Sequence, residues 1–376
     1  MKILLDDEIS GGPPAFAEFG DVQTFVGRDL GPADLDDADI LLIRSVTRVD
    51  EALLGGSNIR FVGTSTAGID HVDVNWLEAN GIEFASAPGC NAEAVAEHVI
   101  CCLFSYAAEI GRRPRSLRVG IVGYGHVGKS LAGKLSGLGI EHLINDPPLA
   151  EREPDLPSRS LEEIVQCDVI TLHVPLTTEG DHPTSRLFGE REFAALQPRA
   201  LLINAARGGI VDEAALSRHA THDPDFRAAV DCWQGEPLVD LDTLAQAWRA
   251  SPHIAGHTFG ARANATAMLR QALGSYLGRK PGDYQQDAQK QLIDVRPGFS
   301  ETAGLLEQIQ PLVNHTGVMR AWSSGDFDAR RQAFDRYRRT HGLRRGFAAS
   351  AVAPAGLQQD TVEDLKALGI QIVGDG

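Results

Sequence analysis

One segment, RVGIVGYGHVG at positions 118–128, restricts the possible fold more than any other part of the sequence. Its glycines Gly123, Gly125 and Gly128 form the pattern G-x-G-x-x-G between an apolar run typical of a strand and a helical pattern. The first glycine of such a pattern permits a tight turn, the second lets a phosphate approach the backbone, and the third allows the helix to pack closely on the strand. The segment therefore predicts a βαβ unit that binds an anion at a helix N-terminus, where free N–H groups and the helix dipole favour negative charge.

An acidic residue, Asp146, follows the next predicted strand, 18 positions beyond Gly128. A carboxylate at this place accepts hydrogen bonds from the adenosine ribose hydroxyls of a dinucleotide and repels a 2′-phosphate. We therefore expect NAD rather than NADP as the cofactor, bound by the three glycines, by the neighbouring His126 and Val127, and by Asp146. The alternative is that Asp146 is only a solvated acid in the turn NDPP.

Short apolar runs alternate with helical patterns on both sides of the glycine motif. The expected strands cover residues 3–5, 22–26, 40–43, 61–62, 82–84, 118–122, 141–145, 168–174, 200–204 and 228–231, and long helices are expected at 91–110, 127–138 and 261–277. Strands that alternate with helices predict an α/β fold with doubly wound, mostly parallel sheets of the Rossmann or flavodoxin-like type. We expect two such domains, one formed by residues 1–92 and 258–280 and the other by residues 93–257.

The composition changes after the second of these domains. Residues 280–287, KPGDYQQD, predict a polar linker, and arginines are concentrated between positions 320 and 345. Residues 361–373 predict one helix and a short strand. We therefore expect residues 281–376 to form a small α+β domain.

The overall composition excludes several classes of protein. A formal net charge of −16 argues against nucleic acid as a partner, because phosphate backbones need a basic surface. No apolar run approaches the roughly 20 residues that cross a bilayer, and the start, MKILLDDEIS, lacks the basic and apolar regions of a signal peptide. The five cysteines are odd in number and lack metal-type spacing: Cys90, Cys101, Cys102, Cys167 and Cys232. We expect a cytoplasmic protein without a membrane partner, a disulfide framework or a metal.

Three later segments place candidate catalytic residues where predicted strands end, which is where open α/β sheets bind ligands. They are INAARGG with Arg207, DCWQGEP with Asp231 and Glu236, and SPHIAGH with His253. The oxidation of a 2-hydroxy acid needs a base for the hydroxyl proton, and a histidine oriented by a carboxylate is suited to that role. Arginine offers a planar fork that matches a substrate carboxylate.

Each of these residues has an ordinary alternative. His253 is one of twelve histidines, Glu236 precedes Pro237 as a turn acid would, and Arg207 could be a surface cation. Their joint occurrence downstream of the glycine motif favours the catalytic interpretation.

The same segments show a resemblance to a known family. The motifs that carry it are GIVGYGHVG, LHVPLT, INAARGGIVDE, WQGEP and SPHIAG. Over roughly residues 35–280 the chain is similar to the D-isomer-specific 2-hydroxyacid dehydrogenases. The resemblance implies that Arg207, Glu236 and His253 are catalytic and that Asp231 contacts the nicotinamide carboxamide. It also implies cofactor contacts for Val174, Ala205, Ala206, Arg207 and Gly256.

Longer segments resemble one branch of this family, whose members oxidise 4-phospho-D-erythronate on a route to pyridoxal 5′-phosphate. They are IRSVTRVDEALL, FVGTSTAGIDHVD, FASAPGCNAEAVAEHV and the C-terminal FDRYRRTHGLRRGF. The resemblance implies substrate contacts for Ser45, Thr66 and His257, a substrate-binding lid made of residues 1–92 and 258–280, and a homodimer formed through residues 281–376. The branch usually has tyrosine where this chain has His257.

Several arginines are candidates for binding the substrate phosphate in this acidic chain. Arg44 lies next to Ser45, and Arg344 or Arg345 of a partner subunit could add charge. The alternative is that these arginines only pair with surface acids. Two alternative functions also stay open: a related dehydrogenase acting on phosphoglycerate, glycerate or lactate, and a non-catalytic protein that senses NAD(H).

Overall fold

A computed structural model of the chain describes residues 1–283, 291–293, 295 and 301–374. The described residues form two compact units, Met1–Asn91 with Thr258–Ala288 (unit 1) and Ala92–His257 with Gln289–Gly376 (unit 2). The predicted linker at 280–287 lies partly outside the described residues. None of the helices described combines the length and apolarity that a membrane crossing requires.

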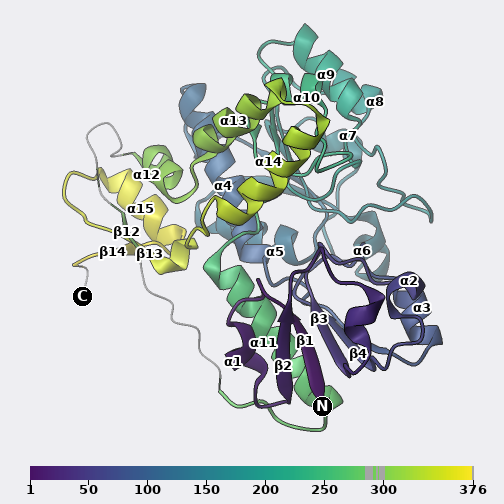
Figure 1. Cartoon of the computed structure of the whole chain (residues 1–376). Helices are drawn as coiled ribbons and strands as arrows, with labels where there is room; N and C mark the ends of the chain where they lie inside the picture. The colour runs from purple at the N-terminus through teal and green to yellow at the C-terminus, as the bar shows by residue number, and fades with distance from the viewer. Residues whose placement is uncertain (284–290, 294, 296–300, 375–376) are drawn as a thin grey trace. The chain divides into compact units, whose positions relative to one another are not determined.

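Unit 1 is built on a five-stranded parallel sheet in the order β2-β1-β3-β4-β5. Its strands are β1 (Lys2–Asp6), β2 (Asp21–Phe25), β3 (Ile40–Ile43), β4 (Phe61–Thr64) and β5 (Glu83–Ala85). Its helices are α1 (Gly12–Phe16), α2 (Glu51–Leu54), α3 (Val74–Ala79) and α11 (Phe259–Tyr276). Helices α1 and α11 cover one face of this sheet and α2 and α3 the other (Figure 1).

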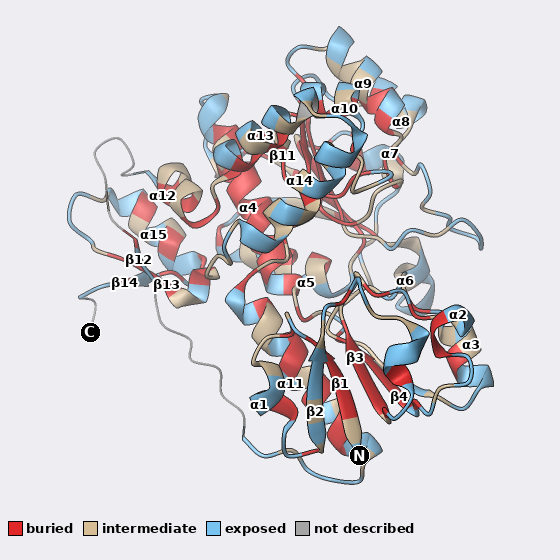
Figure 2. Ribbon diagram, viewed as in Figure 1, coloured by how far each residue is buried: buried red, intermediate tan, exposed pale blue. Residues whose placement is uncertain are grey.

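The central strands β3 and β4 of unit 1 are buried along their whole length because both faces of the sheet are covered. Strand β3, with the sequence ILLI, is buried at every position, and so is β4 (Figure 2). Helix α11 begins with a cap in which the Thr258 hydroxyl accepts a hydrogen bond from the Ala261 N–H, and it packs on the sheet through Leu269 and Leu273.

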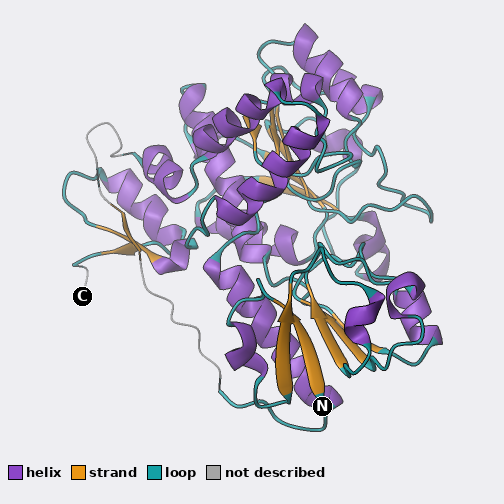
Figure 3. Cartoon of the chain, in the orientation of Figure 1, coloured by secondary structure: helices purple, strands orange, loops and turns teal. Residues whose placement is uncertain are grey.

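Unit 2 contains a six-stranded parallel sheet in the order β11-β10-β9-β8-β6-β7, flanked by helices (Figure 3). Its strands are β6 (Val119–Val122), β7 (His142–Asn145), β8 (Val169–Leu172), β9 (Leu201–Asn204), β10 (Arg227–Val230) and β11 (Arg249–Ala250). The helices around it are α4 (Ala92–Glu109), α5 (His126–Gly137), α6 (Pro147–Arg152), α7 (Leu161–Ile164), α8 (Glu190–Ala194), α9 (Glu213–His222) and α10 (Leu241–Gln246). The strand order reverses between β6 and β8, so the crevice for a ligand is expected where these two strands end.

The C-terminal part of unit 2 adds helices and a small parallel sheet in the order β12-β13-β14. It consists of β12 (Gln291–Ile293), α12 (Thr302–Ile309), α13 (Leu312–Ala321), α14 (Phe327–Thr340), β13 (Ser350–Val352), α15 (Gln359–Ala367) and β14 (Gln371–Ile372). Its apolar side chains join the core of the nucleotide-binding part: Leu305 and Phe347 cluster with residues of α4 and α5. These residues therefore belong to the same compact unit, and their separation as a third domain stays a prediction.

The α/β fold class predicted from the sequence is confirmed, and β1 to β10 lie within about two residues of their expected positions, whereas β11 was not expected. The ends of the central strands in each unit lie at one edge of the sheet because all of the strands run parallel. These edges carry the residues that the sequence predicted to be functional.

Candidate active site and cofactor site

The glycine loop after β6 forms a tight cradle at the start of α5. Gly123 has a φ angle of 94°, and a Cβ at this position would lie 2.7 Å from the backbone carbonyl of His173. A Cβ at Gly128 would lie 2.2 Å from the carbonyl oxygen of Gly123, so only glycine lets α5 approach the loop. Gly125 is the N-cap of α5 and borders open space, because a Cβ there would have no heavy atom within 4 Å.

The open side of this cradle fits the pyrophosphate of a dinucleotide. His126 and Val127 are the first two residues of α5, and the first N–H groups of a helix have no acceptor within the helix. These donors and the helix dipole are the features of an anion site, and the cofactor contacts of the individual residues stay predictions. The residues present therefore fit NAD at this position.

Asp146 directly follows β7 as the N-cap of α6 and is tied to the glycine loop. One carboxylate oxygen accepts a hydrogen bond from the Leu149 N–H at 2.9 Å, and the other accepts one from the Tyr124 N–H at 2.7 Å. The backbone N–H of Asp146 donates to the Ser158 hydroxyl oxygen at 3.0 Å. The side chain is thus held beside the cradle, which is where a ribose-binding acid belongs.

His253 and Glu236 form a close pair. The distance between His253 Nδ1 and Glu236 Oε1 is 2.6 Å, and the second carboxylate oxygen of Glu236 accepts a hydrogen bond from the Trp233 N–H at 3.4 Å. The two side chains are 32% and 27% exposed, so the pair is accessible from solvent. Among the described residues, none forms a hydrogen bond with His253 Nε2, so this nitrogen is available to a ligand.

The backbone of His253 adopts a φ angle of 56°, which is uncommon for a residue other than glycine. Such conformations cost about 1–3 kcal/mol and persist where neighbouring contacts fix the chain. The contacts come from Asp231, which is 1% exposed at the end of β10. Its backbone carbonyl accepts from the His253 N–H at 2.7 Å, and its carboxylate accepts from the N–H groups of Ile254 and Ala255 at 2.8 and 3.0 Å.

Asp231 therefore has a structural role that the sequence did not indicate. Its carboxylate also accepts a hydrogen bond from the Ser251 hydroxyl at 2.6 Å, so that four donors of the segment 251–255 converge on one residue. The contact of Asp231 with the nicotinamide carboxamide stays a prediction.

Arg207 lies in the turn after β9, next to the turn that carries Glu236. The Asn204 side-chain amide, at the end of β9, donates to the backbone carbonyls of Arg207 and Cys232 at 3.0 and 3.3 Å. A Cβ at Gly208 would lie 1.9 Å from the Trp233 carbonyl oxygen, so the two turns are in direct contact. The structure thus brings the Arg207 turn and the His253–Glu236 pair together. Asn204 was missed by the sequence reasoning, although it lies within the INAARGG segment.

The remaining predicted cofactor residues line the same edge of the sheet. Val174 follows β8 and is half-buried, Ala205 and Ala206 follow β9 and are buried, and Gly256 follows the segment held by Asp231. Burial lowers the pKa of the neighbouring His173 to about 3, so this imidazole is neutral at physiological pH. No described residue forms a hydrogen bond with its buried Nδ1.

The predicted substrate residues of unit 1 lie after β3 and β4. Ser45 is exposed, and the Thr66 hydroxyl donates to the Gly68 carbonyl at 2.7 Å. Arg44 is paired with two acids, with N···O distances of 2.6 Å to Asp6 and 3.0 Å to Glu8. The charge of Arg44 is therefore largely balanced within the chain.

The C-terminal arginine Arg344 is not available to a substrate. Its guanidinium donates to the Glu97 carboxylate at 2.7 Å, and the two side chains are only 9% and 5% exposed. The Arg344 alternative is thus wrong, because a carboxylate of α4 in the same chain already holds this guanidinium, and a contact of Arg345 with the substrate phosphate stays a prediction. His257, by contrast, is half-buried, and its ring packs against that of His341 with 5.5 Å between the centroids.

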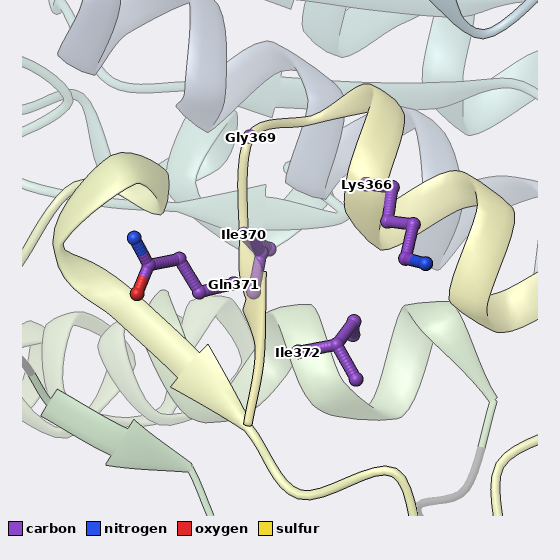
Figure 4. A pocket seen from close by; sticks show the side chains of 5 residues that line it. All are labelled: Lys366, Gly369, Ile370, Gln371 and Ile372. Carbon is purple, nitrogen blue, oxygen red and sulfur yellow. The ribbon is translucent and has the colours of Figure 1, made fainter. Parts of the chain in front are cut away.

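The cysteines, the metal-ligating side chains and a surface hollow of the described residues give no second candidate site. Burial raises the pKa of all five cysteine thiols, so none is an activated nucleophile. No cluster of three or more histidine, cysteine, aspartate or glutamate side chains within the described ranges is arranged to hold a metal ion. A hollow at the edge of the C-terminal sheet contains none of the predicted site residues (Figure 4); its lining is Lys366, Gly369, Ile370, Gln371 and Ile372.

Comparisons with known proteins agree with this geometry. Residues 93–255 match the family model described as D-isomer specific 2-hydroxyacid dehydrogenase, NAD binding domain. The fold is similar to the crystal structure of D-lactate dehydrogenase from Aquifex aeolicus complexed with NAD and lactic acid, with a TM-score of 0.62 and 22% identity over 74% of this chain and 96% of that chain.

Two relatives match along the whole length. The chain is 39% identical to an erythronate-4-phosphate dehydrogenase from Marinobacter nauticus, over 99% of this chain and 100% of the relative. It is 38% identical to a protein of the same name from Hahella chejuensis, over 99% of both chains. The chain therefore belongs to the D-isomer-specific 2-hydroxyacid dehydrogenase family. Within this family it is a full-length homologue of the erythronate-4-phosphate dehydrogenases.

Proposed function

We propose that this protein is an NAD-dependent dehydrogenase that oxidises the C2 hydroxyl of erythronate 4-phosphate. The observation that carries the proposal is the His253–Glu236 pair, at 2.6 Å, in the same unit as the glycine cradle and beside the Arg207 turn. The full-length similarity to erythronate-4-phosphate dehydrogenases supports the choice of substrate.

In the proposed reaction, His253 Nε2 takes the proton of the substrate C2 hydroxyl. The Glu236 carboxylate on Nδ1 orients the ring and stabilises the imidazolium that forms. The guanidinium of Arg207 holds the substrate carboxylate through parallel N–H donors. Bound NAD supplies the acceptor for the hydride that leaves C2, so that the alcohol loses two electrons and two hydrogens and becomes 2-oxo-3-hydroxy-4-phosphobutanoate.

The substrate contacts that the resemblance implies for Ser45, Thr66, Arg44 and His257 are part of the proposal. The position of Ser45 and Thr66 just after parallel strands supports their assignment, because ligands of such sheets bind at the carboxyl ends of the strands. The pairing of Arg44 with two acids indicates that it contributes less net charge than an unpaired arginine would.

We also propose that the protein is a homodimer. Two apolar side chains of the C-terminal part, Val313 and Phe327, are 56% and 58% exposed, and Leu292 of β12 is 59% exposed. A contiguous patch of such side chains marks a surface that another chain covers, whereas single ones are common on monomers, so these three residues are candidates for the interface. Sedimentation of the purified protein tests this assignment.

A panel of substrates tests the proposed activity. NADH formation is followed with erythronate 4-phosphate, erythronate, 3-phosphoglycerate, glycerate and lactate, and the highest kcat/KM is expected for erythronate 4-phosphate. His253→Gln is the matched control, because it keeps a polar side chain but removes the base, and it is expected to lose at least about 100-fold in kcat. If the protein binds NADH but oxidises none of these acids, the sensing alternative replaces the proposal.

A further inference from the structure

The segment 251–257, which carries His253, is held from two directions. From one direction Asp231 accepts the N–H groups of Ile254 and Ala255. From the other, the Arg344 guanidinium donates to the Ala255 carbonyl, with 3.1 Å between Nη2 and the oxygen. Both polar groups of Ala255 are thus fixed, two residues after the unusual backbone conformation of His253.

Arg344 is itself rigidly placed. Its Nη1 donates to Glu97 Oε2 at 2.7 Å, and its Nη2 also donates to the Ala94 carbonyl in the first turns of α4. The other oxygen of Glu97 accepts the Phe347 N–H at 2.8 Å, which fixes the carboxylate as well. A buried guanidinium with its charge balanced and several of its donors used has little freedom to move.

A second contact joins the C-terminal part to the same segment. The ring of His341, at the end of α14, packs against the ring of His257, and it also lies 6.2 Å from the ring of His315. Residues 341–347 therefore contact the segment at Ala255 and again at His257. In both cases the contact is within unit 2 and within one chain.

We propose that Arg344 is a positioning residue for the His253 segment, so that the C-terminal part of the chain helps to build the active site in addition to any role in dimerisation. Only the expected change in kcat/KM rests on the proposed function. The conformation of the segment at Ala255 is a property of the protein itself, and it can be measured without a substrate.

Removal of Arg344 alone would leave the buried Glu97 carboxylate without its partner and so destabilise the fold. An effect on the position of the His253 segment could then not be separated from a loss of stability. The double variant Glu97→Gln/Arg344→Met avoids this problem. Glutamine keeps an oxygen for the Phe347 N–H and methionine fills the space, so no buried charge remains, but the donor to the Ala255 carbonyl is lost. Arg344→Lys is the conservative variant, because its ammonium can still donate to one of the same carbonyls.

A second arginine provides a matched control. Arg320 of α13 also donates to a carbonyl of the nucleotide-binding part, that of Ala247 at 2.7 Å, but this carbonyl precedes β11 and lies outside the His253 segment. Arg320→Met therefore removes a contact of the same kind without touching residues 251–257.

Hydrogen exchange of the peptide 251–257 and steady-state kinetics are measured for the full-length parent and all variants. In the double variant we expect faster exchange in this peptide and a kcat/KM that is roughly 10- to 100-fold lower, as for a base displaced by about 1 Å. The thermal midpoint is expected to stay close to that of the parent. Arg344→Lys should recover part of both properties, and Arg320→Met should match the parent.

The proposed function and the positioning role of Arg344 can be refuted independently of each other. If the parent oxidises no 2-hydroxy acid, the proposed function fails, and the exchange data alone decide whether Arg344 positions the segment. If the double variant exchanges in peptide 251–257 as slowly as the parent, Arg344 does not position it and the inference is overturned. Faster exchange in the double variant but not in Arg320→Met supports it.

Discussion

Glu213 has an unusual environment that leads to a specific prediction. This residue begins α9 and is 7% exposed, and burial raises the pKa of its carboxyl group from 4.5 to about 7. Its Oε1 accepts a hydrogen bond from the Gln234 N–H at 2.5 Å, in the turn that carries Glu236. This bond lowers the pKa, but it does not offset the burial, to which the nearby acids Asp240, Glu236 and Asp212 add.

The raised pKa makes the stability of the fold depend on pH. The folded protein binds the proton of Glu213 more tightly than the unfolded chain does, so this stabilisation is complete below about pH 4.5 and is lost as the pH rises to about 7. The difference between the two pKa values corresponds to about 3 kcal/mol in the free energy of unfolding. Glutamine cannot ionise and still accepts the Gln234 N–H.

Glu213→Gln is therefore expected to be more stable than the parent at pH 8, by up to about 3 kcal/mol or roughly 6 °C in Tm, and to resemble it at pH 4.5. Thermal unfolding across this pH range measures the difference. Asp242→Asn is the matched control, because Asp242 lies in the first turn of α10 but is exposed. A difference between Glu213→Gln and the parent that stays the same at every pH would refute the reasoning.

Three further predictions concern the site. Glu236→Gln removes the charge that orients the imidazole, so kcat should fall by roughly 100-fold or more while the Kd for NADH, measured by fluorescence, stays within about two-fold. Asp146→Ala removes the carboxylate held by the Tyr124 N–H, so the ratio of kcat/KM for NADP to that for NAD should rise by at least about 10-fold; an unchanged ratio would reject the ribose role. Arg338 lies one turn of α14 before His341, whose ring packs against the predicted substrate residue His257, and its guanidinium lies over the Phe334 ring, 5.9 Å from the centroid. If its charge acts on the bound phosphate, Arg338→Ala should raise the KM for erythronate 4-phosphate several-fold, and an equal KM would show that this cation is too far from the substrate.

The parallel sheets and the candidate residues at their edges were predictable from the sequence because both depend on local patterns. A buried parallel strand is a continuous apolar run, and the residues that follow it must lie at the edge where ligands bind. Arg207, Asp231 and the glycine loop could be placed in this way from the sequence alone. Predicting the contact between His253 and Glu236 also requires the assumption that the turns after β10 and β11 meet.

Features that depend on distant contacts could not be predicted in the same way. Arg344 and Glu97 are 247 positions apart, and nothing near either residue indicates the other. Asp231 is similar, because its position after a strand suggests a ligand contact, whereas its four bonds to the segment 251–255 appear only in three dimensions. Of the C-terminal sheet only β14 was expected, as the short strand within residues 361–373, whereas β12 and β13 were missed because each has only three residues, too few to show a period.

The core that α12 shares with α4 limits how this enzyme could be shortened. A fragment that ended before residue 291 would lose Leu305 and Leu306 of α12 and so uncover part of the apolar core that they share with α4. Aggregation would then compete with folding, because exposed apolar surface of this kind associates with other chains. A minimal catalytic fragment would first require polar substitutions along α4.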